Sequence, residues 1–148
     1  MLKLLFITIL IPFSFILKAD EYLLETSAHM DLEEIVIDKN NVFKNFKVES
    51  RWTDSLGEYG KGDCLGFFLE QKENIVAKAY CEYSDSKQDK FWIVLSRSGD
   101  EIESGIGTAT YVKGTGKYQK FVGINCKYAI KYLDKNTNFY RHKCDLNK

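Results

Sequence analysis

The stretch VKGTGKYQKFVGINCKYAIKYL, from Val112 to Leu133, carries the pattern that decides the fold class. In its second half, apolar and polar side chains alternate. One side of the extended chain would carry Ile124, Cys126, Tyr128, Ile130 and Tyr132, and the other side Asn125, Lys127 and Lys131. A period of two residues is typical of a β-strand with one buried face. We therefore expect a strand over residues 124–133.

The first half of the stretch contains Gly114-Thr-Gly-Lys117 followed by Tyr118, which looks like a nucleotide-binding loop. A phosphate-binding P-loop needs a glycine five positions before the glycine of Gly-Lys, and a serine or threonine after the lysine. Tyr111 and Tyr118 stand at these two places, so the motif is incomplete. The simpler interpretation is a turn between strands, in which Gly114 and Gly116 supply positive φ angles.

The period of two recurs along the chain from Phe43 onward. It predicts strands near residues 43–53, 64–70, 75–83, 91–97, 104–113, 124–133 and 138–144, with a further short strand at 34–37. Turn-forming residues separate these runs. Short, aromatic-rich strands at this spacing indicate an all-β fold, an antiparallel up-and-down barrel of about eight strands, with a β-sandwich as the alternative. A closed barrel also leaves no exposed sheet edge.

The N-terminal part divides into two segments. Residues 1–19 have the layout of a secretory signal peptide, with Lys3, an apolar run to Leu17 and Ala19 at a plausible cleavage position. An uncleaved membrane anchor is the alternative, although the apolar run is shorter than the roughly 20 residues that span a bilayer. Residues 20–42 are ambiguous, because residues 27–34 could form a short helix. We take them as a segment leading into a barrel domain at 43–148.

Charge is unevenly distributed along the exported part. Residues 20–110 carry 10 basic and 19 acidic side chains, whereas residues 111–148 carry 9 basic and 2 acidic ones. Such a split can mark a face that binds anions. It can equally mean that the two halves pack together and neutralise each other, since adjacent strands often pair opposite charges.

Four cysteines in an exported chain predict two disulfides. A tight turn at residues 72–73 would set Cys64 opposite Cys81, and a turn centred on Lys135 would set Cys126 opposite Cys144. Directly opposed Cβ atoms in an antiparallel pair lie close to disulfide distance. We therefore expect the pairs Cys64–Cys81 and Cys126–Cys144. A bridge between hairpins, such as Cys81–Cys126, is the alternative.

The expected interior contains groups that could bind a small molecule. The hairpin register places His142 opposite Tyr128, in one row with Tyr140 and the second cysteine pair. Polar groups in an apolar cavity are how small-ligand pockets are built, although His142 could simply be satisfied by a neighbouring group. In the other hairpin, small residues such as Ala77 leave room for a ligand or for two aromatic side chains, Trp52 and Trp92.

Other chemistry has little support in the sequence. The two histidines lie in different segments, and the run from Asp85 to Asp89 lacks the ligands of a calcium loop. We therefore expect no metal and no cofactor. No nucleophile stands beside an evident base, so we assign no catalytic residues and expect a protein that is not an enzyme. Basic side chains interleaved with aromatic ones form a candidate outer face: Lys117, Lys120, Lys127, Lys131, Arg141 and Lys143, with Tyr118, Phe121, Tyr132 and Phe139.

A family resemblance adds to this reading. The segments 79–85 and 89–90, Gly107, Gly123 and the Gly114-Thr-Gly-Lys-Tyr118 turn resemble a group of small exported bacterial proteins of unassigned function. That group is similar to the allene oxide cyclase and dirigent barrels. The resemblance implies an eight-stranded antiparallel barrel with an apolar mouth or cavity. Lys87-Gln88 departs from the usual turn of that family, and no catalytic residues of the plant cyclases can be placed on this chain.

These observations lead to three functional hypotheses. The first is a secreted or periplasmic, non-catalytic barrel that binds a small, partly apolar molecule in its interior. The second is a cell-envelope interaction protein that uses its basic and aromatic outer face on an anionic envelope component. A cyclase or isomerase comes third. Export argues against a nucleic-acid partner, and no membrane insertion is expected once the signal peptide has been removed.

Overall fold

The computed structural model describes residues 21–101 and 104–146. Eight strands and one short 3-10 helix follow one another along the chain: β1 (Glu21–Asp38), β2 (Asn41–Asp54), β3 (Tyr59–Gln71), β4 (Asn74–Asp85), β5 (Lys90–Gly99), β6 (Ser104–Gly114), η1 (Gly116–Phe121), β7 (Asn125–Tyr132) and β8 (Thr137–Asp145). The predicted signal peptide at residues 1–19 lies outside the described residues. No described helix has both the length and the apolar character needed to cross a membrane.

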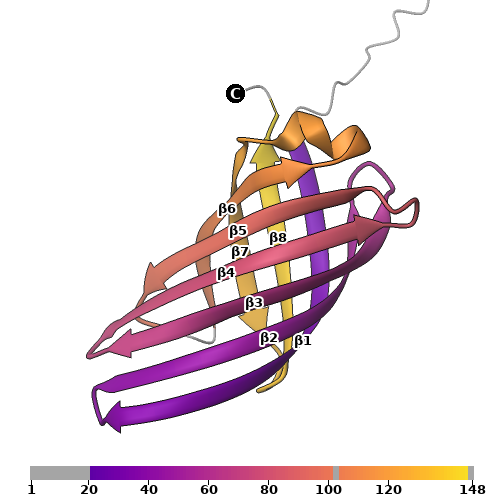
Figure 1. Cartoon of the computed structure of the whole chain (residues 1–148). Helices are drawn as coiled ribbons and strands as arrows, with labels where there is room; N and C mark the ends of the chain where they lie inside the picture. The colour runs from indigo at the N-terminus through magenta and orange to yellow at the C-terminus, as the bar shows by residue number, and fades with distance from the viewer. Residues whose placement is uncertain (1–20, 102–103, 147–148) are drawn as a thin grey trace, which may run out of the picture.

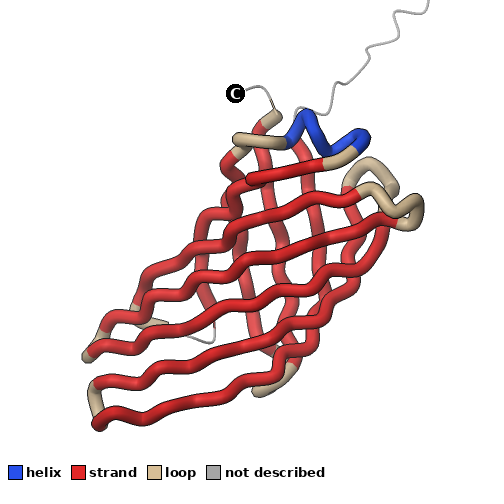
Figure 2. The backbone as a smooth tube through the Cα atoms, viewed as in Figure 1, coloured by secondary structure: helices blue, strands red, loops and turns tan. Residues whose placement is uncertain are grey.

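The strands form one closed barrel in which each strand pairs with its neighbours in the sequence, and β1 pairs with β8. All eight pairings are antiparallel. Figures 1 and 2 show the strands winding around a common interior, with η1 at one end of the barrel. The expected all-β antiparallel barrel is therefore confirmed, and the sandwich alternative is wrong.

The N-terminal segment differs from the expectation. Residues 27–34 are not helical but belong to β1, which runs over eighteen residues and completes the barrel by pairing with β8. The barrel thus begins at Glu21 and not at residue 43. Its alternation was hard to see in the sequence, because inward positions of β1 hold the small or polar Thr26 and Ala28 beside the apolar ones.

The strands extend unequally. Residues 21–29 of β1 pair with β8, whereas residues 31–38 pair with β2 alone. As a result β1 to β4 project together beyond the shorter β7 and β8, at the end opposite η1 (Figure 1). The barrel is therefore closed along the half next to η1 and splayed along the opposite half.

Aromatic rings close the end next to η1. The helix buries Tyr118 and Phe121, whose rings pack against Phe91 at 4.6 Å and Tyr22 at 4.7 Å, measured between ring centroids. Trp52 contacts Phe91 edge-on at 5.3 Å. Tilted and edge-to-face rings at these distances are favourable packing arrangements. This aromatic plug leaves open space only in the other half of the interior.

Both predicted disulfides are present. Cys64 and Cys81 are direct partners in the β3–β4 register and form one bridge, with a Cα–Cα distance of 4.1 Å. Cys126 and Cys144 join β7 to β8 at 4.3 Å. The alternative Cys81–Cys126 bridge is wrong. Such bridges persist in oxidising compartments outside the cytoplasm, so the folded chain belongs to an environment of that kind.

Candidate functional site

A cavity occupies the half of the barrel that the aromatic plug does not fill. It leaves about 50 Å³ open to a water-sized sphere. Its walls are mainly apolar and come from every strand except β6: Met30, Phe46, Val48, Cys64, Phe68, Ala77, Lys78, Ala79, Leu95, Arg97, Tyr128, Ile130, Tyr132, Asn138 and Tyr140. One water molecule needs about 10–15 Å³, so the space exceeds that of a single water.

The cavity owes its existence to the small-residue row noted in the sequence. Ala77 and Ala79 border it, and neither tryptophan fills it. At Gly66 the space that a side chain would take is occupied by the ring of Phe46. The row therefore behaves in two ways: the glycine admits a neighbouring ring, whereas the two alanines leave room.

A second hollow continues the cavity toward the splayed end. The two share Met30 and Tyr132, and the outer hollow has about 480 Å³ of space. Leu32 and Leu133 supply apolar surface there, while charged side chains reach the rim: Glu34, Lys44, Asp134 and Lys135. The interior is thus accessible through a mouth with apolar walls and a charged rim.

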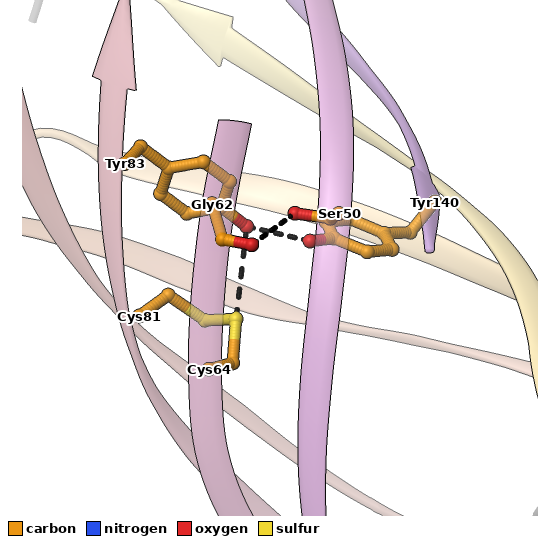
Figure 3. The surroundings of a disulfide bond; sticks show 6 residues. All are labelled: Ser50, Gly62, Cys64, Cys81, Tyr83 and Tyr140. Carbon is orange, nitrogen blue, oxygen red and sulfur yellow. Dashed lines mark hydrogen bonds between the residues drawn. A yellow bond between two sulfur atoms is a disulfide. The ribbon is translucent and has the colours of Figure 1, made fainter. Parts of the chain in front are cut away.

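Two tyrosine hydroxyls meet at the inner end of the cavity. The oxygens of Tyr83 and Tyr140 lie 2.6 Å apart, from β4 and β8 on opposite walls, and Figure 3 shows the rings directed toward each other. Tyr83 also contacts Sγ of the disulfide-bonded Cys64 at 3.9 Å. Burial raises the pKa of Tyr140, with the hydroxyls of Tyr83, Ser50 and Thr26 acting in the opposite direction. Tyr140 therefore remains a neutral hydroxyl at the cavity wall.

Ser50 adds a third hydroxyl to this group. It is buried and donates a hydrogen bond to the carbonyl oxygen of Gly62, at 2.9 Å (Figure 3). Its position could have been found from the sequence, because it continues the inward row of Val48 and Trp52 on β2. The buried hydroxyls are what separate this interior from a purely apolar core.

His142 is fully buried beside Tyr128 and Tyr140, the two tyrosines predicted for the site. Its ring lies 5.5 Å from that of Tyr140 and 6.0 Å from that of Tyr128, between centroids. Neither ring nitrogen has a hydrogen-bond partner among the described residues. Burial lowers the pKa of His142 to about 3, and burial raises the pKa of Tyr128 to about 12. The sequence thus placed all three side chains correctly inside the barrel.

Only two of these three residues reach the cavity. Tyr128 and Tyr140 line it, whereas His142 lies one step toward the aromatic plug and does not. Alternation along one hairpin predicts the row and the face of these residues, but not how far along the row the free space extends. That extent depends on side chains from other strands.

Arg97 was missed by the sequence analysis, although it stands on the inward row of β5 with Ile93. Its side chain is buried and lines the cavity. It lies across Gly105 of β6, where any side chain would collide with the guanidinium group. Its positive charge opposes the burial effect on the pKa of both Tyr128 and Tyr132. Asn138 of β8, also buried and also missed, lines the same cavity.

The two tryptophans predicted for the interior are placed differently. Trp52 is buried in the aromatic plug, where Nε1 donates to the carbonyl oxygen of Lys61. Trp92 is on the outside of β5, donating to Glu82 at 2.9 Å, with the Lys113 ammonium 4.8 Å from its ring centroid. The prediction that Trp92 faces the interior is therefore wrong. A register shift between Trp92 and Ile93 accompanies this outward position.

The Gly114–Lys117 motif is a connection, as predicted, but a longer one than a simple turn. Gly114 ends β6 and Gly116 begins η1. Gly116 has φ of +48°, as expected, whereas Gly114 is absent from the positive-φ positions among the described residues. A side chain at Gly114 would instead collide with the backbone carbonyl of Tyr118. The first glycine is thus needed for close approach and not for its φ angle.

The rest of the motif holds the β4–β5 turn. Lys117 Nζ lies 2.7 Å from Asp85 Oδ2 and 2.6 Å from Glu58 Oε1, and Tyr118 donates to Asp85 at 3.3 Å. Although burial opposes it, hydrogen bonds from Lys117 and from the backbone N–H groups of Lys87 and Asp89 keep the pKa of Asp85 below its usual range. The lysine therefore neutralises a buried carboxylate of its own chain.

The basic outer face is smaller than the sequence suggested. Tyr118 and Phe121 are buried, and Tyr132 faces the interior, so three of its four aromatic residues are not on it. Lys117 is committed to the turn. What remains is the outer side of β7 and β8, with Lys127, Lys131, Phe139, Arg141 and Lys143.

Acidic side chains of β1 neutralise part of this face. Arg141 pairs with Glu25, and Lys143 with Glu21 at 2.6 Å. These contacts join the basic C-terminal part to the acidic N-terminal part, which is the neutralising arrangement weighed in the sequence. Beside them, Arg51, Lys131 and Phe139 border a separate hollow of about 820 Å³ on the outside of the barrel.

No family model matches this chain, and no curated protein matches it. Fold and site therefore define it by themselves, as a closed eight-stranded antiparallel barrel with two disulfides and an interior cavity. Within the described residues, no group of three or more histidine, cysteine, aspartate or glutamate side chains could hold a metal ion.

Proposed function

We propose that this protein is an exported, non-catalytic barrel that binds a small, partly apolar molecule in its interior. The observation that carries the proposal is the cavity itself, with apolar walls, two tyrosine hydroxyls and an open mouth. Interiors are normally close-packed, and unfilled space costs stability. A cavity kept open between Ala77 and Ala79 therefore favours an occupant.

The shape of the space limits the occupant. The cavity of about 50 Å³ is roughly a third of the about 150 Å³ that holds benzene and far below the 300–1,000 Å³ of a drug-sized pocket, so it suits only the end of a short apolar chain. Tyr128 and Tyr140 offer hydroxyls at its wall, and Arg97 offers a guanidinium group. A molecule with an apolar end in the cavity and a polar group toward Arg97 or the mouth suits both parts.

Native mass spectrometry of the protein as purified tests this proposal. We expect a bound mass that is released by organic solvent, and rebinding of a small amphiphile such as 1-hexanol after delipidation. Ala79→Phe, which fills the cavity, should abolish retention and rebinding. Tyr80→Phe is the matched control on the outer side of the same strand and should bind as the native protein does. An Ala79→Phe protein that retains the mass would contradict an interior site.

We also propose export to the periplasm or the extracellular space, directed by residues 1–19. The two disulfides support an oxidising destination. Expression of the full chain in a bacterial host with analysis of the mature N-terminus tests this. We expect cleavage just before or at Asp20, and protein with intact residues 1–19 in the cytoplasm would contradict it.

An anionic partner on the outer face is the second candidate. Lys127 and Lys143 are direct cross-strand partners, and like charges so placed destabilise a sheet. Lys127 and Lys131 have no acidic side chain within 4 Å among the described residues. These two unneutralised lysines, of which Lys131 borders the hollow beside Arg51 and Phe139, favour an anionic envelope component as a partner.

Charge reversal separates this candidate from the first. Lys127→Glu together with Lys131→Glu should abolish salt-sensitive retention of the protein on vesicles containing phosphatidylglycerol. Lys61→Glu, an exposed lysine on β3, serves as control and should retain binding. Unchanged retention of the double variant would remove the outer face from consideration without affecting the interior site.

A further inference from the structure

The lower half of β1 is a sheet edge. Residues 31–38 pair with β2 on one side, and no described strand pairs with them on the other. Figure 1 shows this half of β1 as the outermost ribbon of the projecting part of the sheet. A closed barrel removes exposed edges along its paired length, so this segment is the exception that the splayed end creates.

The backbone groups that face outward at this edge can be identified. At its upper end, Met30 N donates to the Asn136 carbonyl oxygen at 2.7 Å, and Asn136 Nδ2 donates to the Met30 carbonyl oxygen at 2.8 Å. Met30 therefore directs both groups away from β2. Because residues of an antiparallel strand alternate in this direction, Leu32, Glu34 and Val36 also direct their N–H and C=O groups to the open side.

The side chains of the edge are apolar at one end and acidic at the other. Ile35, Val36 and Ile37 are 65%, 62% and 68% exposed. The end of the edge nearer the closed half of the barrel carries Asp31, Glu33 and Glu34. Among the described residues, Glu33 and Glu34 have no basic side chain within 4 Å and Asp31 forms its ion pair with His29, although Lys47 and Lys44 of β2 stand opposite Asp31 and Glu34 in the register. A long edge with exposed β-branched side chains readily accepts another strand.

We propose that this edge binds an extended segment of another polypeptide by strand addition, with apolar residues against Ile35–Ile37 and basic residues against Asp31–Glu34. Charge decides between the available occupants. In an antiparallel pairing of two copies through Leu32, Glu34 and Val36, Glu34 would stand directly opposite Glu34 of the other copy, which is unfavourable. Lysine or arginine side chains in the added strand would neutralise them. The main chain supplies hydrogen bonds to Leu32, Glu34 and Val36.

A synthetic peptide tests the proposal on the intact, oxidised protein. In antiparallel orientation the peptide reads apolar first and basic last, so the probe is acetyl-IVIKKTK-amide in one-letter code. We expect saturable binding by calorimetry and slowed amide exchange at Leu32, Glu34 and Val36. The charge-reversed peptide acetyl-IVIEETE-amide should bind at least tenfold more weakly. Equal binding of the two peptides would overturn the proposal.

Two protein variants locate the binding site. Val36→Pro removes an outward N–H group without removing a hydrogen bond to β2, and Glu33→Lys reverses one exposed charge; each should weaken binding at least tenfold. Glu73→Lys, an acidic position in the β3–β4 turn, is the matched control and should bind normally. If Val36→Pro disturbs the fold, Glu33→Lys and the two peptides still decide. Sedimentation showing a native dimer that Glu33→Lys strengthens would assign the edge to a second copy and overturn the proposal.

Discussion

A buried histidine makes the stability of this barrel depend on pH. In the unfolded chain His142 takes up a proton near its ordinary pKa of about 6.5, whereas in the folded protein its pKa is about 3, because the ring is buried. Between these values the unfolded state binds more protons, so the free energy of unfolding falls as the pH falls. The stabilisation is complete above pH 6.5 and is lost toward pH 3.

His142→Leu should therefore flatten the acid side of the stability profile. The native protein should lose about 1.5 kcal/mol from this group between pH 6.5 and pH 5.0, and the variant should not. Urea unfolding at both pH values measures the difference. His29→Gln changes the other histidine, which is exposed on β1, and should retain the loss that His142 causes. A His142→Leu protein with the native slope would contradict the burial of a neutral imidazole.

Two glycines in the connection between β6 and β7, Gly114 and Gly123, should respond to alanine for different reasons. Gly114→Ala brings a side chain against the backbone carbonyl of Tyr118, which cannot move aside without shifting η1. We expect a loss of about 2–3 kcal/mol, typical of overpacking. Gly123→Ala, in the same connection, has φ of +88° and open space, so it should cost only about 1 kcal/mol of backbone strain. Thermal denaturation of both variants checks the order, which equal losses would contradict.

At the level of elements, Lys117 of η1 supplies the cation for the β4–β5 turn, beside the hydrogen bond from Tyr118 to Asp85. Lys117→Met leaves the buried Asp85 without its cation, so we expect a loss of about 1–3 kcal/mol of unfolding free energy. Lys87→Met is the control, because its ammonium is 3.9 Å from Glu58 and largely exposed. It should change stability by less than about 0.5 kcal/mol. Chemical denaturation of the two variants measures the difference. A loss for Lys117→Met as small as that for Lys87→Met would show that the turn does not depend on the cation.

The elements could be predicted from sequence wherever one face of a strand is uniformly apolar. The row of β7 met that condition, and its register and disulfide with β8 followed from the turn alone. β1 did not, because Thr26 occupies an inward position and Leu23 a partly exposed one. Its strand conformation depends on β2 and β8, neither of which is close to Thr26 in sequence.

The cavity was only partly predictable for a related reason. That Tyr128 and Tyr140 face inward follows from alternation within one hairpin. That Arg97 joins them depends on the barrel bringing β5 across from β7, whereas the outward position of Trp92 follows from the alternation of β5, in which Phe91 and Ile93 face inward. Contacts between strands distant in sequence leave no local signature, so the sequence indicated the lining but not the extent of the space.

For the whole molecule, the two disulfides act on opposite walls. One joins β3 to β4 and the other β7 to β8, and the loops they close, residues 64–81 and 126–144, do not overlap. Each closure should contribute about 3 kcal/mol by restricting the unfolded chain. Because the two loops do not overlap in the sequence, we expect their contributions to add.

Paired alanine substitutions test this independence and the cavity together. Cys64→Ala with Cys81→Ala, and Cys126→Ala with Cys144→Ala, should each lower the free energy of unfolding by about 3 kcal/mol, and the fourfold variant by about the sum. Only the first pair should alter uptake of 1-hexanol, because Cys64 lines the cavity and neither Cys126 nor Cys144 does. If the variant with all four substitutions loses much less unfolding free energy than the sum of the two pairs, one bridge already constrains both walls. An equal effect of both pairs on uptake would mean that binding follows the rigidity of the barrel and not the wall of the cavity.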